Sequence, residues 1–360
     1  MTARKTPEKH DVMRSRVLIG TLATFAFFVG LFSACADEPF FKKGDVIAIV
    51  GGEDMVALSE YGYLELLLTR ALPDYHLRFR NLAWEGDTVF EQRRDLNFPT
   101  WEEQLEKIGA TVVLCQFGQM ESLGKGEGRK AKGDGASKEE IAEFIAAYEK
   151  LIARFSGGGK RRVAMIESTP IGGLIAPDAY GYAQRDFAKK KSLQLLPLVI
   201  ASTQGPIFWA FRDGVHLDEP SHERIARFFA VWFSEKSIPI NESDRLSLLV
   251  AKQATGKTSR GDVVKQLGIR ESAIQDSQKV SQLRQLITAK NRLWFDYWRV
   301  QNWAFLAGDR TEQPSSRDHL DRTKRWFPAE REQFLPLIDA KEQEIWTLAA
   351  KLASPAAASK

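Results

Sequence analysis

The chain contains very little cysteine and histidine. Its 360 residues include two cysteines, Cys35 and Cys115, and five histidines. If Cys35 leaves with an N-terminal signal, Cys115 is alone, so an internal disulfide is excluded. Cys115 ends the apolar run Val112–Cys115, which predicts a buried and inert thiol. No metal-ligand spacing of Cys and His and no phosphate-binding glycine loop occurs, so we predict no metal and no cofactor.

A strong charge of either sign is also absent. The net charge is +4, and residues 1–36 hold five basic and two acidic residues, which leaves the rest of the chain near +1. This balance gives no reason to expect nucleic acid as a partner. The chain is 44% hydrophobic and 27% charged, a composition typical of a globular protein rather than a disordered one.

One long apolar run is present, near the N-terminus. Val17–Phe32 carries no charge, follows a basic segment and precedes the small residues Ala34-Cys35-Ala36. This order predicts a signal peptide over residues 1–36 and a secreted or periplasmic protein. Two alternatives stay open: an uncleaved membrane anchor, or lipidation of Cys35, for which Phe32 is a bulky neighbour. Only in these two cases do we expect a membrane as partner.

Short apolar runs alternate with helical patterns as far as about Ser234. The first, Val46–Val50, is continuous and rich in β-branched residues, which is typical of a strand buried on both faces. Four further strands are predicted, over residues 77–82, 111–116, 162–166 and 195–200. Pro197 weakens the last one. The alternation predicts a parallel sheet with helices on both faces.

Helices are predicted between these strands and throughout the C-terminal third. One covers residues 60–71. Ser137 and Glu140 form a capping box that opens another, which closes at Gly157. Beyond Ile238 the strand-like runs disappear, and residues 283–305 and 330–352 have helical patterns. The first of these is rich in aromatic residues, which we expect to be mostly core. We therefore predict a helical extension over residues 239–360.

Four short blocks follow the predicted strands, where ligands of parallel sheets bind. They are Gly51-Gly52-Glu53, residues 81–88, residues 117–122 and Asp213-Gly214-Val215-His216. Their order and spacing resemble the SGNH (GDSL-type) hydrolase family, and residues 37–238 would form that domain. The extension is similar to the tail of some secreted bacterial members. The resemblance implies an α/β, flavodoxin-like three-layer sandwich with a mostly parallel five-stranded sheet, and hydrolysis of acyl esters.

The resemblance also implies catalytic roles. His216 would be the general base, oriented by Asp213 of the family's Asp-x-x-His motif. Glu53 follows Gly52 at the position of the nucleophilic serine. A carboxylate has no proton for the imidazole to remove, so Glu53 would have to attack as a carboxylate or activate water.

The family's oxyanion donors are altered as well. The backbone donor of the second block matches Ala83 or Gly86, and the two are not distinguished. In the third block, Gly118 is kept, Met120 replaces the asparagine donor and Glu121 follows it. Methionine cannot donate a hydrogen bond, and the loss of one such donor costs about 10²–10³ in turnover. Both changes act against serine-type acyl transfer.

Three functions are compatible with this pattern. The first is an exported hydrolase of small-molecule or glycan esters that uses His216. The second is a catalytically inactive protein that binds a glycan or a partner protein through the same cleft. The third is hydrolysis by a carboxylate pair, Glu53 with Glu121 or Asp213, which requires carboxyl groups ~5–9.5 Å apart.

Simpler interpretations also exist for these polar residues. Asp213 and His216 could form a structural turn. Glu53 could be a solvated loop carboxylate, or part of an acidic site with Asp54, Glu121 and Asp213. Further residues with a plainer expected role are Ser59 (a poor displaced nucleophile, on the next helix), Trp84 (cleft or core), Glu85-Gly86-Asp87 (a polar turn), and the isolated His222 and His319.

Overall fold

The computed structural model describes residues 39–123, 136–169, 179–196, 212–213, 215–234 and 271–353. Residues 41–360 group into one compact unit and residues 1–40 into another. The predicted signal peptide, with Cys35, lies outside the described residues, and so does the predicted boundary at 238/239. Both stay predictions. None of the helices in the described ranges is long and apolar enough to span a bilayer.

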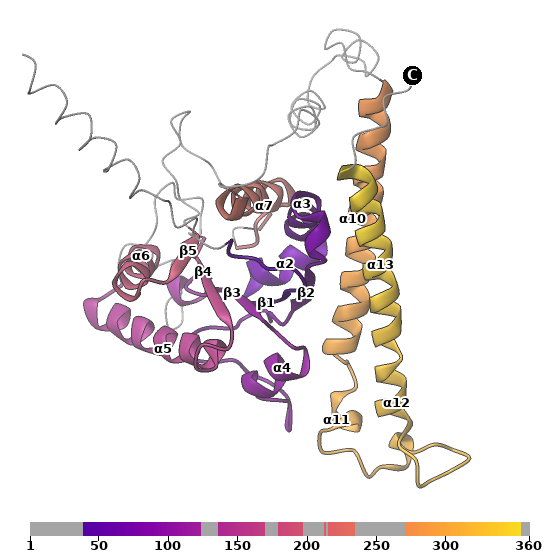
Figure 1. Cartoon of the computed structure of the whole chain (residues 1–360). Helices are drawn as coiled ribbons and strands as arrows, with labels where there is room; N and C mark the ends of the chain where they lie inside the picture. The colour runs from indigo at the N-terminus through magenta and orange to yellow at the C-terminus, as the bar shows by residue number, and fades with distance from the viewer. Residues whose placement is uncertain are drawn as a thin grey trace, which may run out of the picture. The chain divides into compact units, whose positions relative to one another are not determined.

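The centre of the larger unit is a parallel sheet of five strands in the order β2-β1-β3-β4-β5 (Figure 1). The strands are β1 Val46–Gly51, β2 Arg78–Asn81, β3 Val112–Gln116, β4 Arg162–Ile166 and β5 Gln194–Leu196. The predicted fold class and sheet are confirmed. The second half of the predicted fifth strand lies outside the described residues. All of β3 and nearly all of β1 are buried, as continuous β-branched runs predict.

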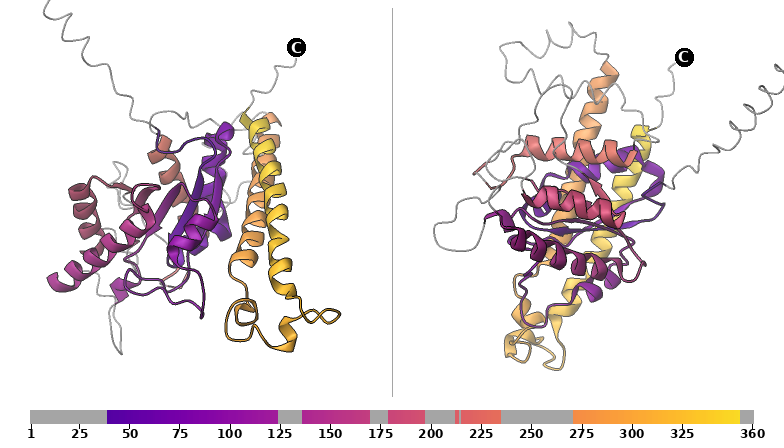
Figure 2. Two further views of the ribbon diagram at one scale, coloured as in Figure 1. Left: turned by 60° about the horizontal axis from the view of Figure 1, so that its bottom comes forward. Right: turned by 90° about the vertical axis from the view of Figure 1, so that its left-hand side faces the viewer.

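Helices cover both faces of the sheet (Figure 2). The elements on one side are α4 Trp101–Lys107, α5 Lys138–Ser156 and α6 Ala179–Lys191; those on the other are α2 Glu53–Tyr61, α3 Tyr63–Ala71 and α7 Glu219–Ser234. The predicted capping box of Ser137 and Glu140 opens α5, which ends at Gly157 with φ 57°. Short 3₁₀ turns occur at Pro73–Tyr75, Glu121–Leu123 and Pro314–Ser316.

The helix predicted over residues 60–71 is in fact two helices. α2 begins at Glu53, directly after Gly52, and Gly62 separates it from α3 with φ 70°. A side chain at Gly62 would approach within 3.0 Å of Thr288 Cγ2. Thr288 belongs to the helix Glu271–Trp298, more than two hundred residues further along the chain, so this close approach cannot be predicted from the sequence around Gly62. Because α2 begins at Glu53, this residue lies in a buried first turn of a helix rather than in a loop.

The C-terminal helices are α10 Glu271–Trp298, α11 Trp303–Leu306, α12 Trp326–Glu332 and α13 Phe334–Ala353. α10 and α13 pack along each other (Figure 1) and contact α2, α3 and β2. The predicted helices are thus present with shifted ends. Most of the aromatic stripe is buried, as predicted: Trp294, Tyr297, Trp298 and Trp303.

Two buried ion pairs tie these helices to the sheet side. Lys290 on α10 lies 2.8 Å from Glu65 of α3, and Arg80 of β2 lies 2.6 Å from Glu342 of α13. All four residues are less than a tenth exposed. Buried charges are costly unless they are paired, so the helices fit the sheet domain in one register.

Candidate active site

Glycines let the first three blocks approach each other at the carboxyl ends of the strands. Gly51 has φ 143°, and a Cβ atom there would lie 2.2 Å from the Gln116 carbonyl oxygen. A Cβ on Gly52 would meet the Asp87 carbonyl at 3.4 Å and Met120 Cγ at 3.9 Å. Only glycine permits this approach at position 51, whereas a Cβ at position 52 would make ordinary van der Waals contacts. Met120 lies next to Gly52, which precedes α2.

The Asp213–His216 pair is formed. Asp213 Oδ2 lies 2.6 Å from His216 Nδ1, and Oδ1 accepts the backbone N–H groups of Val215 and His216. These bonds, first of all the one from the His216 backbone, lower the pKa of Asp213 to about 2. The ionised carboxylate holds a proton on Nδ1 and leaves Nε2 as the basic nitrogen. The turn and the bond from the imidazole to Asp213 therefore occur in one arrangement, and the catalytic role stays a prediction.

A pocket of about 130 Å³ brings His216 and Glu53 together. Its other lining residues are Asp54, Val56, Ala57, Glu60, Tyr61, Glu85, Arg212, Leu217 and His222. His216 is 40% exposed, so its ring is accessible to a ligand. His222 is fully buried, and its Nδ1 has no partner among the described residues. Burial lowers the pKa of His222 to about 4, so that ring is neutral at physiological pH.

Glu53 is not the solvated loop carboxylate that one interpretation proposed, because only 8% of it is exposed. Its Oε1 accepts the Gly86 backbone N–H at 3.0 Å. Its Oε2 is buried without a hydrogen-bond partner in the described part of the chain. Gly86 is one of the two residues that the resemblance implies as oxyanion donor. A protein carboxylate therefore holds the hydrogen bond that a substrate oxyanion would require.

The other candidate backbone donors are also bonded to side chains. The Ala83 N–H donates to Asn81 Oδ1 at 2.8 Å. The Gly118 N–H donates to Glu121 Oε2 at 2.8 Å, and the Val89 N–H to Glu121 Oε1 at 2.7 Å. Burial raises the pKa of Glu121 to about 7. Glu121 thus fixes two loops, and it is not among the residues that line the pocket with Glu53.

Asp54 is the most deeply buried acid of the pocket. It accepts a hydrogen bond from Thr169 Oγ1, and burial raises its pKa to about 7, with a further contribution from the Glu53 charge. Gln119 bonds to the Val215 carbonyl at 3.1 Å and so links the third block to the Asp-x-x-His block. Sequence reasoning did not identify Thr169, Gln119 or Arg212 as part of the site.

The remaining polar residues have distinct partners. Glu85 pairs with Arg299 at 2.6 Å, and Asp87 pairs with Arg94 at 2.7 Å, so the predicted polar turn is clamped at both ends. Trp84 lies between those two guanidinium groups. Ser59 Oγ accepts a hydrogen bond from Asn81. His319 is exposed at the surface. No group of three acidic, His or Cys side chains in the described ranges could hold a metal ion.

Among known proteins, matches to this chain were found only among solved structures. No family model and no curated protein matches the chain. A gut microbial diltiazem-metabolizing enzyme, BT4096, shares 14% identity with a TM-score of 0.47, covering 87% of this chain and 95% of the other. LAE5, an alpha/beta hydrolase enzyme from the metagenome of Lake Arreo, Spain, shares 19% identity, with a TM-score of 0.41 and coverage of 55% and 98%.

A third match is a GDSL-like lipase, BT0569, from Bacteroides thetaiotaomicron VPI-5482. It shares 10% identity with a TM-score of 0.31, covering 59% of this chain and 97% of that one. At these values the matches concern the fold. The structural neighbours of the chain are SGNH/GDSL-type hydrolases and esterases of low sequence identity.

Proposed function

We propose that the chain is an SGNH-hydrolase-like protein that keeps the family's pocket as a binding site and does not carry out serine-type acyl transfer. One observation carries this proposal. Glu53 stands at the nucleophile position and its Oε1 accepts the Gly86 N–H. The same carboxylate removes the attacking hydroxyl and occupies a donor that the transition state would need.

Electrostatics makes the same point quantitatively. An oxyanion near the Gly86 N–H would face the Glu53 carboxylate. Two unit negative charges about 4 Å apart repel by about 4 kcal/mol at an effective dielectric constant of 20. That repulsion corresponds to a factor of about 10³ in rate. Met120 supplies no donor in place of the family's asparagine. Acyl transfer would therefore lack both its nucleophile and much of its charge stabilisation.

The pocket keeps the groups that a polar ligand requires. His216, Tyr61 and Arg212 provide hydrogen-bond donors, and the exposed Glu60 carboxylate provides acceptors. These groups suit a hydroxyl-rich ligand such as a glycan better than an apolar acyl chain.

Turnover and binding assays on the full chain test the proposal. Short-chain p-nitrophenyl esters and acetylated sugars should show no turnover above background, and a fluorophosphonate probe should not label the protein. Glycan-array binding should be weakened but not abolished by His216→Ala, because Tyr61, Arg212 and Glu60 remain in the pocket. Ester turnover that His216→Ala abolishes would refute the inactive-pocket proposal.

A second function is favoured by the intact Asp213–His216 pair. With Nδ1 held at 2.6 Å by Asp213, Nε2 could activate a water molecule for direct attack on a small-molecule or glycan ester. General-base catalysis of this kind contributes about 10²–10⁴-fold. It predicts slow turnover that disappears in His216→Ala, without fluorophosphonate labelling.

Export is a further part of the proposal. It rests on the basic segment, the apolar run and the small residues of positions 1–36. Fractionation of expressing cells, with mass spectrometry of the mature N-terminus, distinguishes cleavage from anchoring and from lipidation at Cys35. A full-length cytoplasmic product would refute export.

A further inference from the structure

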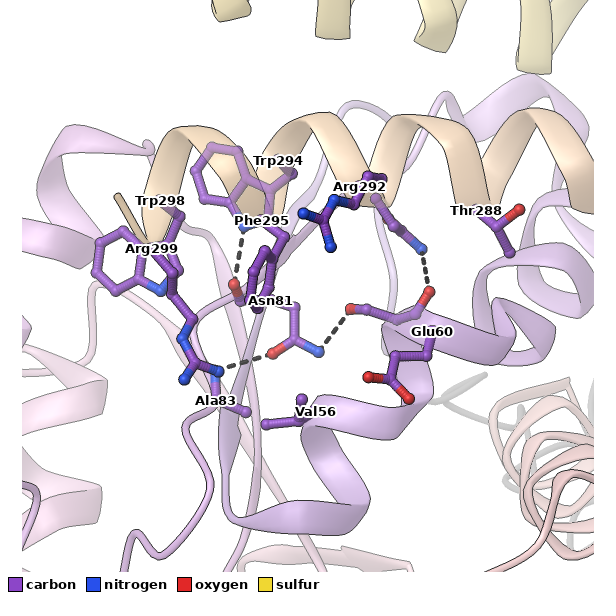
Figure 3. Close-up of a pocket in the computed structure, with 12 residues that line it drawn as sticks. Val56, Glu60, Asn81, Ala83, Thr288, Arg292, Trp294, Phe295, Trp298 and Arg299 are labelled. Atoms are coloured by element: carbon purple, nitrogen blue, oxygen red, sulfur yellow. Dashed lines mark hydrogen bonds between the residues drawn. The ribbon is translucent and has the colours of Figure 1, made fainter. Parts of the chain in front are cut away.

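A second pocket, of about 220 Å³, lies between α2, the end of β2 and α10. Figure 3 shows Trp294, Phe295 and Trp298 on its α10 side, Val56 and Glu60 on its α2 side, and Asn81 between them. Neither the resemblance nor the comparisons assign a role to this pocket. We propose that it binds one uncharged sugar ring.

The wall formed by α10 is aromatic. Trp294 and Trp298 are almost completely buried, and Phe295 is half-buried. Aromatic rings offer large, rigid apolar surface at a low cost in conformational entropy. Trp294 is fixed by a 2.8 Å hydrogen bond from its Nε1 to the Asn81 carbonyl. Phe295 is therefore the ring with surface open to the pocket, and a sugar would contact it beside the guanidinium groups of Arg292 and Arg299, which lie 5.2 and 5.0 Å from its centroid.

Polar groups without complete partners surround this wall. Ser59 Oγ accepts from Asn81 Nδ2 at 2.6 Å, and its own proton has no acceptor in the described ranges. Asn291 uses one N–H for the Ser59 carbonyl. Donors and acceptors so arranged match hydroxyl groups, each of which donates and accepts.

Charge argues against an ionic ligand. Arg299 pairs with Glu85 at 2.6 Å, and Arg292 pairs with Asp296 at 2.9 Å. The exposed Glu60 carboxylate makes no ion pair within the described residues. An anion would meet Glu60, and a cation would meet two guanidinium groups. A neutral polyhydroxylated ring satisfies the polar groups without adding a charge that lacks a counter-ion.

The two pockets adjoin. Val56 and Glu60 line both, and the Glu85–Arg299 pair joins a residue of the first pocket to a residue of the second. A ligand longer than one ring would reach from the aromatic wall to His216. This extension alone rests on the proposed function; the sugar subsite on α10 does not depend on the chemistry at His216.

Saturation-transfer NMR and calorimetry on the full chain test the subsite. The probes are glucose, galactose, mannose, xylose and N-acetylglucosamine, with glucuronate as the charged comparison. We expect at least one neutral sugar to bind, and to bind more tightly than glucuronate. Phe295→Ala and Ser59→Ala should each weaken binding about tenfold, with unfolding curves confirming that both variants are folded.

Two controls separate this proposal from the previous one. Gln282→Ala changes an exposed residue of α10 outside the pocket and should bind as the wild type does. Phe295→Ala and Ser59→Ala should weaken sugar binding by the same factor when His216→Ala is also present, whatever the ester assays show. The subsite proposal is wrong if no neutral sugar binds at millimolar concentration. It is equally wrong if both pocket variants bind as the wild type, or if glucuronate binds best.

Discussion

Replacing Glu53 by serine and Met120 by asparagine should create an acyl-reactive site in the pocket of His216. The serine would stand at the start of α2, in the pocket that His216 also lines. Removing the carboxylate frees the Gly86 N–H, which now donates to Glu53 at 3.0 Å. The asparagine would add the side-chain donor that methionine lacks. Each change restores one component of serine-type acyl transfer.

The size of each step follows from what it restores. Glu53→Ser alone supplies a nucleophile and one backbone donor, so we expect slow labelling by a fluorophosphonate. Adding Met120→Asn should increase the rate about 10²–10³-fold, the usual effect of one oxyanion donor. Adding His216→Ala to the double variant should lower it about 10²–10⁴-fold, because the general base is lost.

The assay is the rate of fluorophosphonate labelling, followed by intact mass and peptide mapping to position 53. The matched control is Glu53→Ala with Met120→Asn, which frees the same N–H without a hydroxyl group. A folded double variant that is never labelled would refute the geometry, because position 53 would then not face His216. Labelling of the wild type would refute the inference that Glu53 prevents serine-type acyl transfer.

Three further predictions concern stability and reactivity. Asp54 and Glu121, whose pKa values burial raises to about 7 from 3.8 and 4.5, bind protons more tightly when folded. The free energy of unfolding should therefore fall as pH rises from about 4 to 7, by up to about 1.4 kcal/mol per pH unit per group. Urea denaturation of Asp54→Asn should show a smaller decrease, and an unchanged profile would contradict the pKa assignment. Lys290→Ala leaves the buried Glu65 unpaired and should lower the free energy of unfolding, measured by urea denaturation, by about 3–5 kcal/mol. A decrease below about 1 kcal/mol would contradict the buried pair. Cys115 is fully buried and its pKa is raised to about 12 by burial, so it should react with Ellman's reagent only after unfolding.

The fold could be predicted because its signals are local. Val46–Val50 is buried as its continuous β-branched pattern predicts. The strand predicted over residues 162–166 has the same ends as β4 in the structure. Ser137 and Glu140 make the hydrogen bonds of their capping box. In each case the decisive interactions lie within a few residues or within one face of one element.

The site could be predicted only as a set of positions. The order of the four blocks predicts that Glu53, Met120 and His216 converge; Glu53 and His216 line one pocket, and Met120 lies near Gly52. The hydrogen bond from Gly86 to Glu53 joins residues 33 positions apart. It forms because Glu53 is the first residue of α2, which sets where its side chain points. α2 lies between Gly52 and Gly62, and at Gly62 both the left-handed φ of 70° and the close approach of Thr288 on α10 favour glycine. Such long-range steric constraints leave no mark on local periodicity.

The second block, rather than the nucleophile position alone, carries the departure from acyl transfer. Its amides at Ala83 and Gly86 are bonded to Asn81 and Glu53, and its Glu85 is held by Arg299, which follows α10. While Asn81 and Glu53 accept these two bonds, neither N–H group is free to donate to an oxyanion. The same α10 contacts build the aromatic wall of the neighbouring pocket. The two proposals therefore share one structural basis: Arg299 both holds Glu85 of the second block and lines the pocket beside α10.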